Sequence, residues 1–401
     1  MKIIVCNIGS TSFKFQLLDM SCEAMIARGY AERVGTEKST VTYWLGEEKV
    51  FSNEIPISSQ REAVHHALKF LIDTKFKILN SLDEIQGVGF KTIQAGEKNG
   101  SVLLTDDVLQ AMEDYRDLAP AHNPPYLTAI YMFKELLPDT KLVGVFEPGF
   151  HIHAPDYAKV YGTPYEWFEK FGVIKYGYHG SSHRYVTAMT VKILDLPKNN
   201  HKIISCHLGG SSSLCAFRNG VAVDTSMGFT PQSGLIQGTR VGDIDPFVFP
   251  YIMKKKNITL DQALKECTKN GGLAGLSGIS ADMRDIIEAV KTGNNRALLA
   301  RNKFIYDVKR YVGEFIVIME GLDAIAFTGG IGQHDPGLRE EVLKSLEFIG
   351  IKLDNEKNND NKQLISAADS RIKALVLETN EELVVARETK NVIEKYKSDN
   401  H

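Results

Sequence analysis

The sequence predicts an α/β protein of two domains related by duplication. Its length of 401 residues is enough for two domains, each with its own buried core. A strand, a Gly/Ser turn and a second strand occur at residues 3–17 and again at residues 203–217. Short apolar runs alternate with segments of helical spacing after each copy, which is typical of α/β proteins.

The two copies of this repeat align without a gap. Residues 3–12 and 203–212 are identical at five of ten positions, which favours duplication over chance resemblance between two hairpins. Gly and Ser at each turn leave backbone N–H groups unshielded, so each turn can hold phosphate oxygens. We therefore expect two related domains that offer phosphate turns to a shared cleft, a common place for ligands.

The domain boundaries are placed at residues 1–149 and 150–382, with a helix over about 383–401 that packs back on the first domain. Beyond the repeats, strands are expected at 40–44, 88–93, 142–146 and 324–328. Helices are expected at 61–70, 106–117, 126–137, 260–269, 280–290, 296–320 and 336–346, and from 379 to 397. A further helix follows residues 176–184 and is expected to have a serine N-cap. Residues 354–363 are polar and are expected to form an exposed loop.

Composition restricts the class of protein. The net charge is −3, with 43% hydrophobic and 24% charged residues, so neither nucleic acid nor an anionic membrane is an expected partner. The odd number of cysteines, five, favours free thiols and a reducing compartment. We see no signal peptide and no apolar run of membrane-spanning length, and we expect a cytoplasmic protein.

The second repeat continues into a stretch that combines several features of phosphoryl transfer. Its Gly/Ser turn is followed by Arg240, which a Gly-Thr pair precedes, and by Asp243 and Asp245. A phosphate cradle, a cation and carboxylates together indicate phosphoryl transfer with a divalent metal. The plainer alternatives are an ordinary hairpin turn and a surface ion pair between Arg240 and one of the two aspartates.

A strand, a Gly-rich loop and a helix start follow one another over residues 324–346, an order that suits a nucleotide. The loop, residues 329–334, lacks the G-K-[ST] of a Walker motif and does not fit a dinucleotide fingerprint. His179 and His183 lie four residues apart, but no H-E-x-x-H pattern or third ligand accompanies them, so zinc is not expected.

With these motifs in order, the chain resembles the acetate kinase family. The motifs are N-x-G-S-x-S-x-K at 7–14, AHNPP at 121–125, YGYHGSSHRYV at 176–186, DTSMGFTP at 224–231, GTRVGDIDP at 238–246, SGISADMRD at 277–285, FTGGIG at 327–332 and TNEEL at 379–383. The resemblance implies two duplicated actin-like, sugar-kinase-like (ribonuclease-H-like) domains with an interdomain cleft. It also implies a homodimer and reversible transfer of a phosphoryl group from ATP to acetate or a related short carboxylic acid, with Mg²⁺ or Mn²⁺.

The resemblance also implies roles for individual residues. The catalytic residues are Glu147, His179 and Arg240. The acceptor site is formed by Lys91, Ile93, Ala121, Tyr178 and Pro231. The nucleotide contacts Lys14, His207, Leu208, Gly209, Gly210, Ser211, Asp282, Met283, Arg284, Gly330, Ile331, Gly332, Gln333 and His334. The metal ligands are Asn7 and Glu381.

Four departures from the family pattern concern the acceptor side. Lys91 stands where the family has arginine, Glu147 where it has aspartate, Ala121 where it has leucine and Tyr178 where it has phenylalanine. They predict a larger and more polar acceptor pocket. Four interpretations stay open: an acetate kinase that has drifted, a kinase for a larger or more polar acid, a hydroxyl kinase with Glu147 as general base, and a nucleotide-binding sensor with weak turnover.

Overall fold

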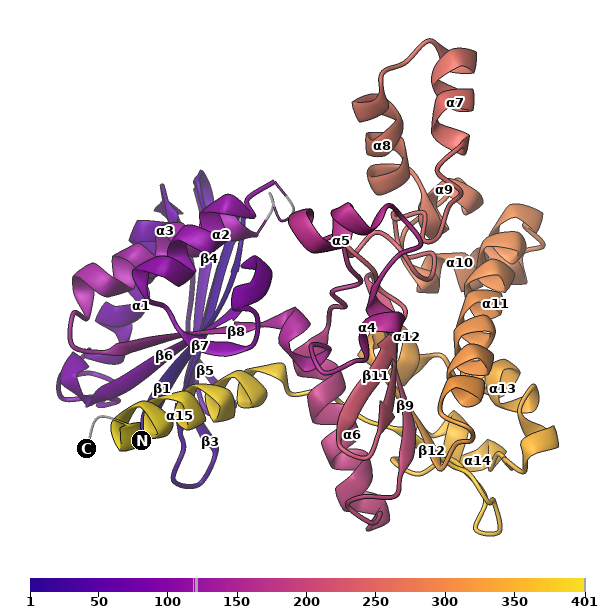
Figure 1. Ribbon diagram of the computed structural model, residues 1–401. Coiled ribbons are helices and arrows are strands. Elements are labelled where there is room, and N and C mark those ends of the chain that lie inside the picture. Colours follow the sequence, from indigo (N-terminus) through magenta and orange to yellow (C-terminus); the bar gives the residue numbers. More distant parts are fainter. Residues whose placement is uncertain (118, 120–121, 400–401) are drawn as a thin grey trace. The chain divides into compact units, whose positions relative to one another are not determined.

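The computed structural model describes residues 1–117, 119 and 122–399 (Figure 1). Contacts within the chain divide it into two compact units. Unit 1 comprises Met1–Ile152 and Asn380–His401, and unit 2 comprises His153–Thr379. The boundaries expected from the sequence lie at 149/150 and near 383. No helix in the described part of the chain is both long and apolar enough to cross a bilayer.

Unit 1 contains a sheet with the strand order β5-β4-β3-β2-β1-β6-β8-β7. Its strands are β1 (Lys2–Gly9), β2 (Ser12–Asp19), β3 (Ala24–Glu32), β4 (Thr36–Leu45), β5 (Glu48–Ile57), β6 (Ile85–Thr92), β7 (Ser101–Leu103) and β8 (Lys141–Phe146). Strands β1, β6 and β8 are parallel, whereas β2 to β5 extend the sheet as antiparallel hairpins. The carboxyl ends of three neighbouring strands therefore meet at one edge.

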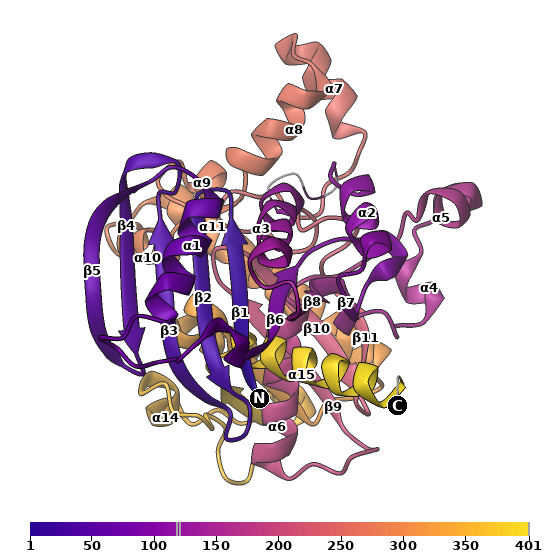
Figure 2. The same ribbon diagram turned by 90° about the vertical axis from the view of Figure 1, so that its left-hand side faces the viewer.

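The helices of unit 1 cover both faces of this sheet (Figures 1 and 2). They are α1 (Gln60–Leu71), α2 (Asp106–Asp114), α3 (Asn123–Leu136) and α15 (Glu381–Asp399), with short 3₁₀ turns η1 (Leu82–Glu84), η2 (Gly96–Lys98) and η3 (Glu147–Phe150). Side chains alternate along β6. Gly87 and Gly89 face α15 so closely that a Cβ would approach Ile393 and Thr389 within 2.5 Å and 2.2 Å.

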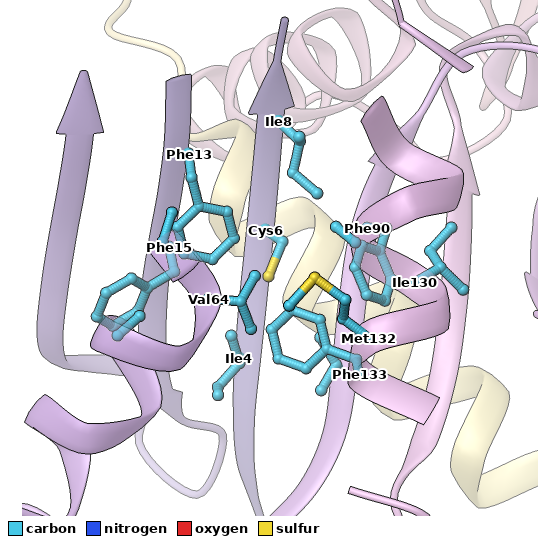
Figure 3. Close-up of a cluster of buried hydrophobic side chains, with 14 of the residues drawn as sticks. Ile4, Cys6, Ile8, Phe13, Phe15, Val64, Phe90, Ile130, Met132 and Phe133 are labelled. Atoms are coloured by element: carbon cyan, nitrogen blue, oxygen red, sulfur yellow. The ribbon is translucent and has the colours of Figure 1, made fainter. Parts of the chain in front are cut away.

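The opposite face of β1 and β6 builds the core of unit 1. Ile4, Cys6 and Ile8 on β1 pack with Phe90 of β6 and with side chains of α1 and α3, as Figure 3 shows. All of these residues are buried. Asn7, between Cys6 and Ile8 near the end of β1, is half-buried.

Unit 2 repeats the central part of this topology. Its sheet has the order β11-β10-β9-β12-β13, with β9 (Lys202–Leu208), β10 (Ser212–Arg218), β11 (Val221–Thr225), β12 (Ala324–Thr328) and β13 (Lys373–Val376). The order and directions match those of β3-β2-β1-β6-β8 in unit 1. The expected duplicated α/β fold class is confirmed.

The helices of unit 2 pack around its sheet, and the pair α7 and α8 projects from the rest of the unit (Figure 1). They are α4 (Asp156–Lys159), α5 (Tyr165–Phe171), α6 (Gly180–Leu194), α7 (Val248–Lys256), α8 (Leu260–Lys269), α9 (Gly272–Ser277), α10 (Met283–Lys291), α11 (Asn295–Ile318), α12 (Gly329–His334), α13 (Pro336–Lys344), η4 (Glu347–Ile349) and α14 (Asn355–Asn359).

Three local expectations were wrong. Residues 329–334 form the short helix α12 instead of a loop, and Asn355–Asn359 form helix α14 because the Asp354 side chain accepts a hydrogen bond from the Lys357 N–H. Helix α6 has no serine cap. Its N-cap is His179, whose backbone is left-handed with φ 55°. That conformation costs free energy for a non-glycine residue and is often found at functional sites.

Candidate active site

In unit 1, four of the proposed site residues gather at the carboxyl ends of the parallel strands. Asn7 and Lys91 follow the paired residues Cys6 and Phe90 of β1 and β6. Glu147 comes directly after β8, and Glu381 begins α15. Open α/β sheets bind ligands at this edge. We call Asn7, Lys91, Glu147 and Glu381 the unit 1 cluster.

The ammonium of Lys91 donates a hydrogen bond to the carboxylate of Glu381. The Lys91 side chain is 20% exposed and that of Glu381 15%. Burial lowers the pKa of Lys91, but the carboxylates of Glu147 and Glu381 together outweigh this effect and raise the pKa above its usual value. Lys91 is therefore a firmly charged cation between two carboxylates.

Tyr126 of α3 reaches the same edge of the sheet. Its hydroxyl accepts a hydrogen bond from the Ile8 N–H at 3.2 Å and donates to Asn7 Oδ1 at 3.5 Å. Burial raises the pKa of the Tyr126 hydroxyl, which keeps its proton available for donation. Tyr126 thus orients the amide of Asn7, a role that no motif of the sequence indicates.

The unit 1 cluster offers oxygen ligands to a divalent metal. The amide oxygen of Asn7 and the carboxylate of Glu381 suit Mg²⁺, which prefers oxygen and commonly takes one or two carboxylates together with substrate phosphates. Within the described residues, no group of three or more His, Cys, Asp or Glu side chains is placed to hold a metal ion by itself. The donors therefore fit a metal that arrives with phosphate oxygens.

In unit 2, the predicted phosphate turn joins β9 to β10. The Gly209 N–H donates to Ser212 Oγ at 3.1 Å, and Ser212 Oγ donates to the Gly209 carbonyl at 2.9 Å. A Cβ on Gly210 would meet nothing within 4 Å, whereas one on Gly209 would lie 3.9 Å from the Gly330 nitrogen. The turn is therefore open on one side and adjoins the start of α12.

The start of α12 depends on a glycine. Gly329 has φ +76°, and a Cβ there would lie 2.5 Å from the Leu208 carbonyl oxygen. Only glycine allows this approach between β12, α12 and the end of β9. Two segments proposed to contact the nucleotide, His207–Ser211 and Gly330–His334, are thus held side by side.

Three histidines lie next to the turn. His179 Nδ1 is 2.8 Å from Ser213 Oγ, and the His179 ring stacks on that of His207 with centroids 4.2 Å apart. His183 is fully buried, with its nitrogens 2.9 Å from Ser205 Oγ and 2.8 Å from Ser213 Oγ. Because a hydroxyl has one proton, Ser213 donates to at most one of the two imidazoles and accepts from at least one, and its contact with Nδ1 orients His179.

Arg240 is anchored to the phosphate turn. Its Nη1 donates to Ser211 Oγ at 3.0 Å, to Gln237 Oε1 at 3.1 Å and to the Pro231 carbonyl at 3.3 Å. Burial lowers the pKa of the Arg240 guanidinium, but arginine stays protonated at neutral pH. The structure therefore places a permanent, partly desolvated cation beside the turn.

The alternative surface ion pair between Arg240 and Asp243 does not form. Asp243 instead accepts from Gly234 N–H at 2.7 Å and from Arg310 and Tyr311, each at 2.6 Å. These contacts of Asp243 help to fix the loop that carries Arg240. The positive charge of Arg240 is therefore not neutralised by Asp243.

Residues 282–284 lie at the start of α10. The Asp282 carboxylate caps the helix through the Arg284 N–H at 2.9 Å, and hydrogen bonds from the Arg284 side chain lower the pKa of Asp282 to about 2. Met283 is buried in the core of unit 2, so its side chain packs there and anchors the start of α10. Arg284 is exposed, and its guanidinium forms an ion pair with Asp282.

The remaining site residues divide between the units. Tyr178 is buried, and its hydroxyl donates to the Phe229 carbonyl at 2.8 Å, so the added hydroxyl is used inside the protein. Ile93 is half-buried just after β6. Lys14 is exposed on β2 with its ammonium 5.2 Å from the Tyr30 ring centroid. Ala121 lies outside the described residues.

Gln237 and Ser213 are not among the site residues predicted from the sequence, although each contacts a proposed catalytic residue. Gln237 directly precedes the GTR motif, and Ser213 directly follows the Gly/Ser turn. Their positions next to recognised motifs were the available signal. Their side-chain partners come from elsewhere in the fold, which the local pattern does not reveal.

Comparison with known proteins shows the family of the chain. The family model described as the acetokinase family matches residues 2–387. Acetate kinase of Clostridium novyi is 44% identical over 398 residues, which cover 98% of this chain and 99% of the relative. Acetate kinase of Alkaliphilus metalliredigens is 44% identical over 397 residues, which cover 98% and 100%.

Solved structures show the same similarity. The acetate kinase of Porphyromonas gingivalis superposes with a TM-score of 0.90 at 37% identity, covering 98% of this chain and 99% of the other. A propionate kinase from Francisella tularensis superposes with a TM-score of 0.89 at 33% identity over the same shares. The match extends over nearly the whole chain and both units. The chain belongs to the acetokinase family.

Proposed function

We propose that this protein transfers the γ-phosphoryl group of ATP reversibly to acetate or a closely related short carboxylate. Membership of the acetokinase family makes it a phosphotransferase with a carboxylate acceptor. The single observation that carries the proposal is Arg240, which hydrogen-bonds Ser211 of the phosphate turn and forms no ion pair with Asp243. A cation held in this way is suited to the charge of a phosphoryl group in transfer.

The reaction needs little proton chemistry. A short carboxylic acid is already ionised at neutral pH, so one of its oxygens can attack the γ-phosphorus directly. The new P–O bond forms as the bond to the β-phosphate oxygen breaks, and ADP leaves with that electron pair. The products are an acyl phosphate and ADP. The main barrier is the approach of one anion to another, which cations lower.

Each unit is assigned a part of this task. In unit 1, Lys91 attracts the acceptor carboxylate, with Ile93 nearby, and Glu147 lies beside Lys91. In unit 2, residues 207–211, 282–284 and 330–334 bind the nucleotide. Arg240 and His179 stabilise the phosphoryl group, and Tyr178 and Pro231 belong to the acceptor side. The contacts of Arg240 and His179 with Ser211 and Ser213 support this division.

We infer that Mg²⁺, or Mn²⁺, accompanies the nucleotide. Asn7 and Glu381 would hold it, since both present oxygen atoms at the edge of the unit 1 sheet. When bound, the metal would supply positive charge to the phosphate oxygens and so lower their repulsion toward the acceptor. Tyr126 keeps the Asn7 amide oriented for this role.

Two further properties are proposed. A homodimer is supported by the resemblance to acetate kinases, and light scattering on a sizing column would measure the mass. A cytoplasmic location is supported by the cysteines, all of which carry free thiols, three of them buried. Fractionation of cells that produce the native protein would test the location.

A larger acid is the second candidate acceptor. Two observations favour a larger acid. The chain is similar to a propionate kinase, and the ammonium of Lys91 is a point charge on a shorter side chain than the arginine of the family. Glu147 acting as base for a hydroxyl acceptor, and a sensor without turnover, are the remaining alternatives. Turnover with short acids, compared with glycerol or sugars as acceptors, separates all of these.

The variant Arg240→Ala tests the proposal directly. Turnover should fall by about a hundredfold or more while the Kd for ATP changes little, because the cation acts on charge that develops in the transition state. Arg218→Ala, at an exposed position at the end of β10, is a matched control. Near-normal turnover in Arg240→Ala would remove Arg240 from the mechanism.

A further inference from the structure

We propose that Gln237 is a positioning residue for phosphoryl transfer, because its side-chain amide fixes the guanidinium of Arg240 against the phosphate turn. The inference rests on the proposed function, in which Arg240 acts on the transferred group. It adds a residue that connects three parts of the unit 2 site: the turn, the arginine and the acceptor-side loop at Pro231.

Gln237 is fully buried, and both ends of its amide are used. Its Oε1 lies 2.9 Å from Ser211 Oγ, 3.1 Å from Arg240 Nη1 and 3.3 Å from the Ser212 nitrogen. Its Nε2 donates to the Pro231 carbonyl at 2.8 Å. The partners fix the orientation of the amide, since an arginine and a backbone N–H only donate and a carbonyl only accepts.

The backbone around Gln237 is itself fixed. The Gln237 N–H donates to the Arg240 carbonyl at 3.0 Å, and the Gln237 carbonyl accepts from Leu273 N–H at 2.8 Å. On either side, the Ile236 N–H donates to Asp307 at 3.2 Å and the Gly238 N–H donates to the Gly210 carbonyl at 3.0 Å. The amide therefore projects from a rigid base and can hold Arg240 in one place.

These contacts fix the orientation of the Arg240 guanidinium. All the hydrogen bonds of its side chain within the described residues run through Nη1, to Gln237, Ser211 and Pro231. The remaining N–H groups on Nη2 and Nε form the other edge of the planar fork, which matches phosphate oxygens in pairs. Anchoring one nitrogen pre-organises the other edge and reduces the rotamer freedom that binding would otherwise cost.

Gln237 touches Arg240 but is not proposed to touch the substrate, so a purely structural role must be separated from a positioning role. Replacing the Gln237 amide would also remove the hydrogen bond that its Oε1 accepts from the buried Ser212 N–H, which lowers the stability of the protein. A stability loss alone would lower the amount of folded enzyme without changing its kinetics. A role through Arg240 predicts that the effect of the Gln237 substitution disappears once Arg240 is absent.

A double-mutant cycle provides the test, with Gln237→Leu, Arg240→Ala and the double variant. Soluble, folded protein is assayed for kcat and for KM of ATP and of the acid. We expect Gln237→Leu to lower kcat about 10- to 100-fold with KM for ATP within about threefold, and the double variant to be no slower than Arg240→Ala. Gln110→Leu, at an exposed glutamine bonded to Asp114 on α2, is the control.

A second variant covers the case in which Gln237→Leu does not fold. Gln237→Glu keeps the size and the acceptor oxygen but pairs Arg240 with a carboxylate, so kcat should again fall only while Arg240 is present. Multiplicative losses in the double variant, or an unchanged kcat in Gln237→Leu, would overturn the inference. A nearly normal kcat in Arg240→Ala would instead show that the proposed function of Arg240 itself is wrong.

Discussion

Lys91 and Glu381, which lie 290 positions apart in the sequence, hold each other by a hydrogen-bonded ion pair in unit 1. One is proposed to bind the acceptor carboxylate and the other the metal. A carboxylate that already faces an ammonium gives up that partner when a divalent cation takes the same oxygen. Metal binding should therefore release Lys91 toward the acceptor, and Lys91 should weaken metal binding.

Removing the ammonium should strengthen metal binding. In Lys91→Met, which keeps an unbranched side chain but removes the ammonium, the affinity for Mn²⁺ in the presence of ADP should rise about tenfold, or about 1.4 kcal/mol. Electron paramagnetic resonance of free Mn²⁺ measures this without turnover. Lys98→Met, which breaks the exposed pair with Asp107, is the matched control. An unchanged or weaker affinity in Lys91→Met would show that the two cations do not compete.

Glu147 should be needed for the chemical step. It is 2% exposed, and its carboxylate helps to raise the pKa of Lys91. Glu147→Gln keeps the size but removes the charge, so kcat should fall about a hundredfold while the Kd for ATP stays near normal. Glu135→Gln, in an exposed pair with Arg61, serves as control. Retained turnover in Glu147→Gln would mean that another residue carries this role.

Arg339 should be important for stability. It is fully buried, and its guanidinium donates to the carbonyls of Gly332, Gln333 and Asn358 and to the side chains of Asn358 and Asn361. Lysine has three donors on a point charge and cannot satisfy these five contacts.

The variant Arg339→Lys should therefore lower the free energy of unfolding by about 3 kcal/mol. Urea unfolding measures it, and Arg371→Lys, where the arginine is exposed, should change it far less. Because two of the carbonyls belong to α12, the Kd for ATP should also rise in Arg339→Lys. Equal stability of the two variants would contradict this account of Arg339.

The acceptor preference should reflect the cation at position 91. A lysine binds a carboxylate with less directional control than the two-pronged arginine of the family. We expect the unmodified protein to favour propionate or a polar-substituted short acid over acetate in kcat/KM. Lys91→Arg combined with Ala121→Leu should move the preference toward acetate. If acetate is already the best acceptor, the departures at these positions do not alter specificity.

Elements with local signals were predicted well. The helix at Leu260–Lys269 has the expected bounds because Thr259 and Gln262 form a capping box before an amphipathic run. The duplicated hairpins were visible because both turns kept Gly and Ser at the same positions. The phosphate turn and Arg240 then followed from one continuous stretch of sequence.

The features that could not be predicted from the sequence depend on contacts between distant segments. Helix α12 is glycine-rich and short, and its last carbonyls are held by Arg339 of the next helix. The pair of Lys91 with Glu381 joins β6 to the C-terminal helix, so neither residue could predict its partner. His179 takes a left-handed backbone that its sequence does not favour. Sequence patterns report local propensity, whereas these features arise from tertiary packing.

Trapping of the acyl phosphate tests the central claim most directly. The purified protein is incubated with ATP, Mg²⁺ and hydroxylamine together with acetate, propionate or butyrate, and the acyl hydroxamate and ADP are measured in the same sample. We predict acid-dependent hydroxamate in amounts equal to the ADP formed, and its loss in Arg240→Ala. ATP binding without hydroxamate from any of the acids would contradict the assignment of this chain as a kinase of short carboxylates.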